Sequence, residues 1–531
     1  MAPNEEDFLL ERYDSELLEH KASQPCDTHV GFFSASNLAG VLLASTGVFL
    51  SGIDQSFVMA AYVDIASSMK ALKNASLLLT AYNLGYCSAL PLYGKISDRY
   101  GRKLPLLGAN FIFGVGCLLS AISFSFWQII LGRAVTGIGA AGMVSLVSVI
   151  ITDSVIPSHV ASMKSYVTIV SVLGRCSGGV IGAFILELFG WKWSFVFQVP
   201  LVLLGGLACF LLLPESLKKI SIKDESFTPK DFDILGLIFF VLAIGFYLKA
   251  TSQDTLEFGL RQHPFVSLAA FLACAFGILF FATEFLYAKE PFLPLSRLSG
   301  TMNAYLVVQI ITFFAQETYL ANLPSYFVYT EKFKTSTIAK YLITSSVGFS
   351  VGCVVGGNII KKTRRMKFQS ILSLSFGILV YLLIASQWKQ DAHIMEASYI
   401  FLAGFLSGTL VTATIGALAA ICSRQMIAST ITSYYLSQEV GSLLGTGFST
   451  AALQGSFTAS LYRELPDSLQ KSKIISGVSK DINFFKTLPA QLQLQIQKLF
   501  LQNFYMIAYM AAGVAVLALP ILCMTPDQMM E

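Results

Sequence analysis

The chain has 531 residues, of which 54% are apolar and only 13% are charged, whereas an average soluble protein is about 25% charged. Its 42 phenylalanines would leave large sticky patches on a soluble protein, so the composition indicates a polytopic membrane protein. The formal net charge of +4 gives no reason to expect a nucleic-acid partner.

Fourteen apolar runs are each long enough to cross a bilayer, which takes about 20 residues. We therefore predict an all-α polytopic membrane protein with 14 transmembrane helices. The runs fall near 38–62, 75–94, 104–125, 127–151, 165–188, 192–213, 232–250, 265–287, 302–327, 338–360, 368–387, 397–422, 428–452 and 501–523.

The segment before the first span, residues 1–36, is acidic and has no apolar stretch, so we expect no cleaved signal peptide. Within it Glu5, Leu9 and Leu10 fit the acid-x-x-x-Leu-Leu pattern of sorting signals that adaptors read on membrane proteins bound for lysosome-like organelles. A chance match is the alternative for so short a pattern. Asn74 begins a glycosylation sequon beside the second span, where we expect it to stay unused.

The loop between the second and third spans, Gly94–Lys103, reads G-K-I-S-D-R-Y-G-R-K and is dense in cations. Short loops rich in Lys and Arg stay on the cytosolic side of a membrane. The short loops that share this side hold almost twice as many cations as those on the other side. This bias predicts that both termini lie in the cytosol.

The positions of the histidines and cysteines argue against several kinds of site. All five histidines lie in the tail or in loops, so a proton carrier inside the membrane has to be a carboxylate. The nine cysteines include no C-x-x-C pair, which argues against disulfides and against a metal site. The sequence contains no ATP-binding motif, so we expect neither a primary pump nor a cofactor-dependent enzyme.

A weak internal repeat relates the first half of the chain to the second. Gly357–Arg365, after the tenth span, aligns with Gly94–Arg102 at an offset of 263 residues. Parallel halves related by an axis along the membrane normal produce such a repeat. The alternative is that two cytosolic loops look alike because both are basic. With six spans in each half, the seventh and eighth become an inserted pair.

Five motifs follow one another in the first half of the chain. They are D-Q-S-F-V at Asp54–Val58, the loop Gly94–Lys103, L-G-R-A-V-T-G-I-G at Leu131–Gly139, G-R-C-S-G-G-V-I-G-A at Gly174–Ala183, and G-W-K-W-S-F with Gln198 and Pro200.

These motifs resemble those of the major facilitator superfamily. The loop matches the family signature G-x-x-x-D-R-x-G-R-[KR] without a miss, and the other four resemble motifs of its 14-span drug/H⁺ antiporters. Two positions depart from the antiporter pattern, since Ser56 replaces a Thr and Gly179 stands where Pro is usual, which puts strict antiport in doubt. Within this branch the chain looks most like the fungal vacuolar basic amino acid transporters.

The resemblance implies two six-helix bundles plus two inserted helices. It also implies a conformational latch formed by Gly94, Asp98, Arg99, Gly101 and Arg102, and an antiporter-like helix with close-packing glycines at Gly174, Gly178 and Gly182. The expected domains are a cytosolic tail (1–36), an N-terminal bundle (37–213), a linker with the inserted pair (214–300), a C-terminal bundle with a luminal loop at 456–500 (301–523), and a second cytosolic tail (524–531).

Charges inside the predicted spans carry the proposed mechanism, because each costs at least ~2.5 kcal/mol at mid-bilayer. Asp54 and Arg133 both lie about 10–12 Å below the non-cytosolic face at 1.5 Å per residue. We hypothesise that Asp54 is a proton-coupled carboxylate whose protonation changes as Arg133 approaches and as water gains access. The alternative is a static ion pair, and Asp54→Asn separates the two: a stable protein without proton-driven uptake, or a misfolded one.

The second half supplies two further acids, Glu317 and Glu439, which the resemblance places on helices that line the transport cavity. Arg175 is a second cation inside the membrane, and it either pairs with an acid or holds a substrate carboxylate. Glu317 and Glu439 serve either substrate binding or helix contacts. The same alternatives hold for the polar residues that could complete the lining, which are Tyr82, Asn83, Gln309 and Gln316.

The sequence thus favours a proton-coupled transporter, most consistent with H⁺ antiport, that imports basic amino acids from the cytosol into the vacuole. Its partners are the lipid bilayer, protons, small cationic amino acids and a sorting adaptor at the tail. The first alternative is a drug efflux antiporter at the plasma membrane. The second is a nutrient sensor or scaffold that transports nothing, which the short cytosolic tails argue against.

Overall fold

The computed structural model describes most of the chain. The described residues are 35–69, 71, 77–154, 157–213, 234–251, 264–287, 300–331, 335–388, 394–422, 427–465, 471–480, 485 and 487–526. The predicted sorting signal at Glu5, Leu9 and Leu10 and the sequon at Asn74 lie outside these residues, as do most of the predicted tails.

Helices dominate the described part of the chain, and no strand is found there. The first half contains α2 (Ala35–Ser68), α3 (Leu77–Tyr100), α4 (Lys103–Ala121), α5 (Phe126–Ser154), α6 (Pro157–Phe189) and α7 (Trp191–Leu212). Two helices follow, α8 (Ile234–Ala250) and α10 (Pro264–Leu286). The second half contains α11 (Gly300–Leu320), α12 (Leu323–Glu331), α13 (Thr335–Thr363), α14 (Met366–Gln387), α15 (Ile394–Ile421), α16 (Ile427–Glu464), α17 (Lys471–Lys480), α19 (Ala490–Val516) and α20 (Ala518–Met524).

Twelve of the 14 predicted spans each coincide with one helix, and the other two each coincide with a long helix followed by a short one, so the predicted helix count is confirmed. Nine helices in the described ranges are long and apolar enough to cross a membrane by length and composition. Two predicted spans are broken in the structure. α11 ends at Leu320 and α12 begins just before Pro324, while α19 ends at Val516 and α20 holds Pro520 in its first turn. Proline has no N–H to continue a preceding helix, which explains both breaks.

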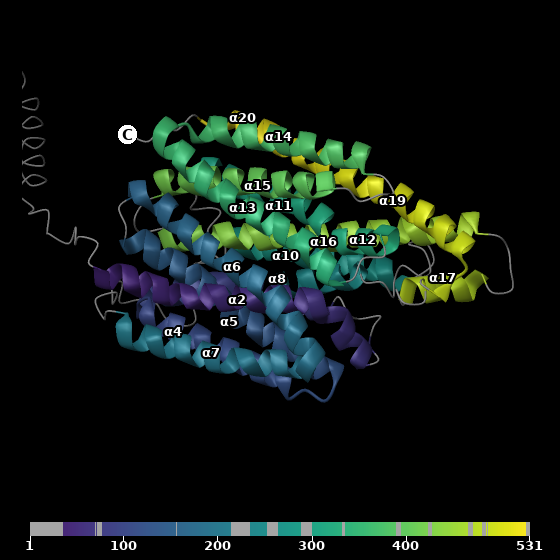
Figure 1. The fold of residues 1–531 in the computed structure, drawn as a ribbon. Coiled ribbons are helices and arrows are strands. Elements are labelled where there is room, and N and C mark those ends of the chain that lie inside the picture. The colour runs from purple at the N-terminus through teal and green to yellow at the C-terminus, as the bar shows by residue number, and fades with distance from the viewer. Residues whose placement is uncertain are drawn as a thin grey trace, which may run out of the picture.

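The helices form two bundles, α2 to α7 and α11 to α19. In Figure 1, α2, α4, α5 and α7 lie in the lower part and α14, α15 and α19 in the upper part. The largest buried apolar cluster lies in the second bundle, whereas two further clusters centre on the first. Helices pair in the same way in both bundles. The matching contacts are α3 on α5 and α13 on α15, α2 on α6 and α11 on α16, and α4 on α7 and α14 on α19.

Backbone details support the repeat at the residue level. A Cβ added at Gly85 would overlap the carbonyl of Ala134 in α5, and one added at Gly348 would overlap that of Phe401 in α15. Gly85 and Gly348 are separated by the offset that aligns the two basic loops. At the same offset Gly101 has φ 81° and Arg364 has φ 56°, so both loops turn through the left-handed region. The repeat is therefore built into the helix packing and is more than a likeness of two basic loops.

The two halves meet through α3 on α16 and α6 on α13. A Cβ at Gly94 of α3 would lie 2.9 Å from Oγ1 of Thr432 in α16, and Ser148 of α5 hydrogen-bonds Tyr435 at 2.6 Å. These contacts lie at the end where α3 and α5 finish and α16 begins, which is the predicted cytosolic end. The halves are therefore in contact at that end in this conformation.

The two inserted helices pack against each other, and α8 contacts helices of both halves. α8 and α10 are in contact along their length, and α8 also contacts α3. Tyr247 of α8 donates a hydrogen bond to the carbonyl of Leu444 in α16 at 2.6 Å. The domain boundaries expected from the sequence remain a prediction, but the inserted pair lies where that prediction puts it in chain order.

Candidate functional site: buried charges between the two halves

Asp54 of α2 and Arg133 of α5 form a buried ion pair. Nη1 of Arg133 donates to Oδ2 of Asp54 at 2.6 Å, and the side chains are 1% and 0% exposed. The other carboxylate oxygen, Oδ1, is buried without a hydrogen-bond partner among the described residues. An unpaired carboxylate oxygen is a ready acceptor for a proton or for a water molecule. The equal depth expected from the sequence thus leads to direct contact.

Tyr82 of α3 completes the surroundings of this pair. The guanidinium carbon of Arg133 lies 4.7 Å from the centre of the Tyr82 ring, a cation–π contact. The Tyr82 hydroxyl hydrogen-bonds Ser51 at 3.0 Å and accepts a bond from Gln55 at 3.4 Å, both on α2. Nε of Arg133 also donates to the carbonyl of Leu78 at 3.5 Å, so Asp54 is not the only hydrogen-bond partner of the guanidinium.

A second charged group joins the two halves. Arg175 of α6 acts electrostatically on Glu317 of α11 and on Glu439 of α16, and the two acids also act on each other. We call these three residues the charged triad. Arg175 is exposed and both glutamates are half-buried, so the triad is more accessible than the Asp54–Arg133 pair. Two acids against one base leave it with a net charge of −1.

The ion pair and the charged triad are linked through Tyr82. Its ring and hydroxyl contact the surroundings of Asp54 and Arg133, and the same residue interacts electrostatically with Glu439. Tyr86, stacked on Tyr82 with ring centres 6.1 Å apart, also lies within the field of Glu439. Tyr82 therefore lies within the electrostatic field of both charged groups.

The remaining predicted cavity residues separate into two kinds. Asn83 of α3 and Gln316 of α11 are half-buried. Gln309 is fully buried, and its Nε2 donates to Thr414 of α15 and to Tyr434 of α16, the latter at 3.2 Å. These contacts of Gln309 are internal to the second half, as expected of a residue that holds helices together.

The predicted latch lies at the closed end of the molecule. Gly94 contacts Thr432 across the halves, and Arg102, directly before α4, donates to Ser97 of α3 at 2.9 Å. Arg99 is exposed, and its guanidinium lies 5.6 Å from the ring of Tyr100. The side chain of Asp98 lies outside the described part of the chain.

The glycines of the antiporter-like helix bring α6 against α2. A Cβ at Gly174 would overlap the carbonyl of Phe49, one at Gly178 that of Ile53, and one at Gly182 the ring of Phe57. Gly179, at the position where the related motif has Pro, has no atom within 4 Å of an added Cβ. Three glycines thus allow close packing, and the fourth faces away from it.

Sequence reasoning did not anticipate the partners of Arg175 or the burial of Glu284. Arg175 and its two acids are far apart in sequence, and no local pattern connects them. Its unusual position in the middle of a span was the one available signal. Glu284, near the end of α10, is only 3% exposed because α10 packs against the bundle.

The model of the Major Facilitator Superfamily matches residues 44–446. Among curated relatives, the vacuolar membrane amino acid uptake transporter fnx2 of Schizosaccharomyces pombe is 27% identical over 89% of this chain and 81% of its own length. The multidrug resistance protein fnx1 of the same yeast is 26% identical over 86% of each chain. Vacuolar basic amino acid transporter 1 of Saccharomyces cerevisiae is 25% identical over 78% of each chain.

Among solved structures, the human organic anion transporter MFSD10 (TETRAN) superposes with a TM-score of 0.62, covering 92% of this chain and 99% of that chain at 13% identity. At that identity the likeness speaks for the fold alone. The family match spans most of the chain, and the helix pairing of the two bundles agrees with it. The chain belongs to the major facilitator superfamily and is a membrane transporter, not an enzyme.

Proposed function

We propose that this protein is a proton-coupled transporter that moves basic amino acids from the cytosol into the vacuole in exchange for protons. The observation that carries the proposal is the charged triad, in which Arg175 of one half lies within the electrostatic field of Glu317 and Glu439 of the other. Two relatives whose names record vacuolar amino acid transport support the substrate class and the membrane.

The triad has the charges that a basic amino acid requires. Arg175 can bind the α-carboxylate through a bidentate pair, while Glu317 and Glu439 receive the α-ammonium and the cationic side chain. The substrate's net charge of +1 then neutralises the triad's −1. A neutral amino acid leaves one charge uncompensated, which costs at least ~2.5 kcal/mol or about fiftyfold in affinity.

Proton coupling is assigned to Asp54 and Arg133. A proton taken up by Asp54 from the acidic lumen removes the counter-charge of Arg133 and adds positive charge beside Tyr82. This added positive charge acts through space against a cation held at the triad, so protonation of Asp54 would weaken the binding of a cationic substrate. Proton uptake and substrate release would then favour the same step of the transport cycle.

Alternating access supplies the movement. The halves are in contact at the predicted cytosolic end through α3 and α16. If that end is cytosolic, closure there would belong to the lumen-facing part of the cycle. The predicted latch, with Asp98 and Arg99, would stabilise this closed end in one state only. Cytosolic termini and a sorting adaptor on the Glu5–Leu10 segment complete the proposal.

Uptake of labelled lysine and arginine into proteoliposomes with an acidic interior tests the proposal. We expect accumulation that an uncoupler abolishes and that Glu317→Gln and Glu439→Gln both reduce at least about tenfold. Glu284→Gln, an acid outside the triad, is the matched control and should transport normally. Uncoupler-resistant accumulation, or full activity without either triad acid, would contradict the proposal.

The second candidate is drug efflux, which the name of one relative favours. Export of a lipophilic cation by cells or vesicles, with no uptake of lysine or arginine under the same gradient, would support this alternative. A sensor without flux would show substrate binding and no transport in the same vesicles.

A further inference from the structure

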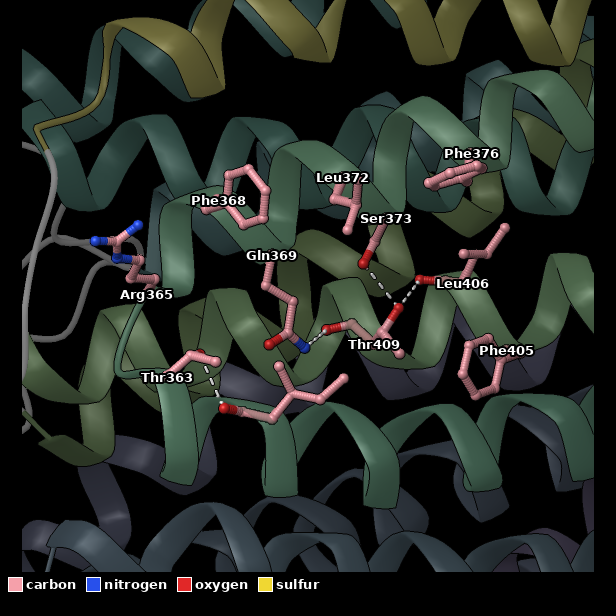
Figure 2. A pocket seen from close by; sticks show the side chains of 11 residues that line it. Thr363, Arg365, Phe368, Gln369, Leu372, Ser373, Phe376, Phe405, Leu406 and Thr409 are labelled. Atoms are coloured by element: carbon pink, nitrogen blue, oxygen red, sulfur yellow. Dashed lines mark hydrogen bonds between the residues drawn. The ribbon is translucent and has the colours of Figure 1, made fainter.

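The outer surface of the second half holds a pocket of about 600 Å³ between α13, α14 and α15. Its wall is largely apolar, with Phe368, Leu372 and Phe376 from α14 and Phe405 and Leu406 from α15 (Figure 2). No residue of the ion pair or of the charged triad lines it. The pocket is therefore separate from the proposed transport route.

The pocket opens toward the bilayer. Phe368, Leu372 and Phe376 are 62%, 45% and 50% exposed although they lie on a transmembrane helix. Exposed apolar side chains on such a helix face lipid hydrocarbon. The occupant that this surface meets first is a membrane lipid.

The internal repeat explains why the pocket exists in only one half. In the first half the ring of Tyr93 of α3 and the Cβ of Ala109 of α4 both lie directly against Gly142 of α5. In the second half Gly356 stands at the place of Tyr93 by the offset of 263 residues. A Cβ at Gly137 would overlap the carbonyl of Tyr82 and one at Gly404 that of Ser345, so α15 matches α5 with an offset of 267 residues and Thr409 stands at the place of Gly142. The atoms nearest to Gly356 belong to Gln369 and Thr409, both of which line the pocket. The aromatic ring that seals the first half is thus missing from the second.

One polar group inside the pocket has no partner. The Gln369 side chain is 6% exposed, and its Nε2 donates to the carbonyl of Thr409 at 3.4 Å. Its Oε1 is buried without a hydrogen bond among the described residues. The hydroxyl of Thr409 donates a hydrogen bond to that of Ser373 at 2.8 Å. The polar group of the pocket that lacks a hydrogen-bond donor is therefore Oε1 of Gln369. An occupant that brings an N–H or O–H to this depth removes the cost of an unpaired buried acceptor.

Positive charge gathers at the mouth of the pocket. Arg365 lines the mouth and is exposed, and Lys361 and Lys362 are exposed in the last turn of α13. Figure 2 shows the guanidinium of Arg365 pointing away from the apolar wall. Such a cluster at the end of transmembrane helices attracts lipid phosphate. From its mouth inward, the pocket thus presents the cation of Arg365, the hydrogen-bond acceptor of Gln369 and an apolar wall.

We propose that this pocket binds a phosphosphingolipid of the surrounding leaflet. The phosphate pairs with Arg365, the amide N–H below it donates to Oε1 of Gln369, and a chain lies along Phe368 and Phe376. Gln369 is four residues along α14 from Arg365, so it lies about 6 Å deeper. A glycerophospholipid presents ester carbonyls at that depth, which are acceptors and leave Gln369 unpaired, whereas a sphingolipid presents a donor.

Binding of ceramide 1-phosphate and of phosphatidic acid with matched chains to the purified full-length protein tests the assignment. Native mass spectrometry should show that ceramide 1-phosphate binds about tenfold more tightly. Arg365→Ala should weaken both lipids about tenfold. Gln369→Leu should abolish the preference between them, because it removes the acceptor.

A size-matched pair of variants on one helix controls for folding. Leu372→Trp places a large side chain in the pocket and should block both lipids, while Leu379→Trp, exposed two turns further along α14, should bind both normally. Thermal unfolding shows whether each variant is folded. Equal binding of the two lipids by the native chain, or unchanged binding in Leu372→Trp, would overturn the proposal. Since all three helices belong to one half, lipid binding should not depend on transported substrate.

Discussion

At the scale of single residues, the pairing of Asp54 with Arg133 is the feature that decides the mechanism. The sequence alone placed both at one depth, because helical rise converts position into depth. It could not show that both side chains are almost fully buried or that Tyr82 stacks on the guanidinium. These facts revise the expectation that Asp54→Asn gives a stable protein, because that change leaves Arg133 buried without its counter-charge.

Asp54→Asn should therefore destabilise the fold by about 3–5 kcal/mol, the usual cost of breaking a buried ion pair from one side. The double variant Asp54→Asn/Arg133→Gln removes both charges and should recover most of that loss. Thermal unfolding in detergent measures both. If the double variant is no more stable than the single one, the uncompensated charge of Arg133 is not the cause of the destabilisation.

Arg175 makes a separate prediction about substrate recognition. If it binds the α-carboxylate, Arg175→Gln should raise the KM for lysine at least about tenfold, because a charge-assisted bidentate contact is lost. Cadaverine, the diamine that lysine becomes without its carboxylate, should be unaffected or improved. Competition of each compound against labelled arginine checks this. An equal loss for lysine and cadaverine would mean that Arg175 holds the helices instead.

At the scale of helices, prediction from the sequence was accurate where physics is local. Span positions follow from apolar runs, and the breaks beside Pro324 and Pro520 follow from proline chemistry once the helix ends are known. The glycine spacing of α6 predicted close packing, but only the structure identifies the partner as α2. The partner of a glycine-lined helix face depends on how the whole bundle is arranged, so the local sequence pattern cannot predict which helix it will be.

This contact can be tested with two neighbouring glycines. Gly178→Leu should destabilise the protein by about 1–3 kcal/mol or more, because the new side chain overlaps the backbone of α2 at Ile53. Gly179→Leu, beside it, has open space and should be tolerated. The fraction of monodisperse protein on size exclusion, followed by thermal unfolding, distinguishes them. Equal sensitivity of the two sites would remove close packing as the explanation.

At the scale of the whole molecule, the repeat and the contact between halves set the transport cycle. The repeat was visible in the sequence only at the two basic loops, while the matching pairs of helices and the glycine contacts needed the structure. The charged triad was out of reach of the sequence for the same reason, since Arg175 and the two acids that lie in its field belong to different bundles.

A cross-link should trap the closed end. A Cβ at Gly94 would lie 3.5 Å from the Cβ of Thr432, close to the separation found in disulfides. In a background without the native cysteines, Gly94→Cys/Thr432→Cys should form a disulfide on oxidation and stop transport, and a reductant should restore it. Continued transport by fully cross-linked protein would exclude the opening of α3 from α16.

The most direct test of proton coupling compares two assays on Asp54→Asn/Arg133→Gln in proteoliposomes. The first is accumulation of labelled lysine driven by an acidic interior, and the second is lysine–lysine exchange without a gradient. Our account predicts that accumulation is lost while exchange persists, because the charged triad is intact and only the proton carrier is gone. Gradient-driven accumulation at the native rate in this variant would contradict it.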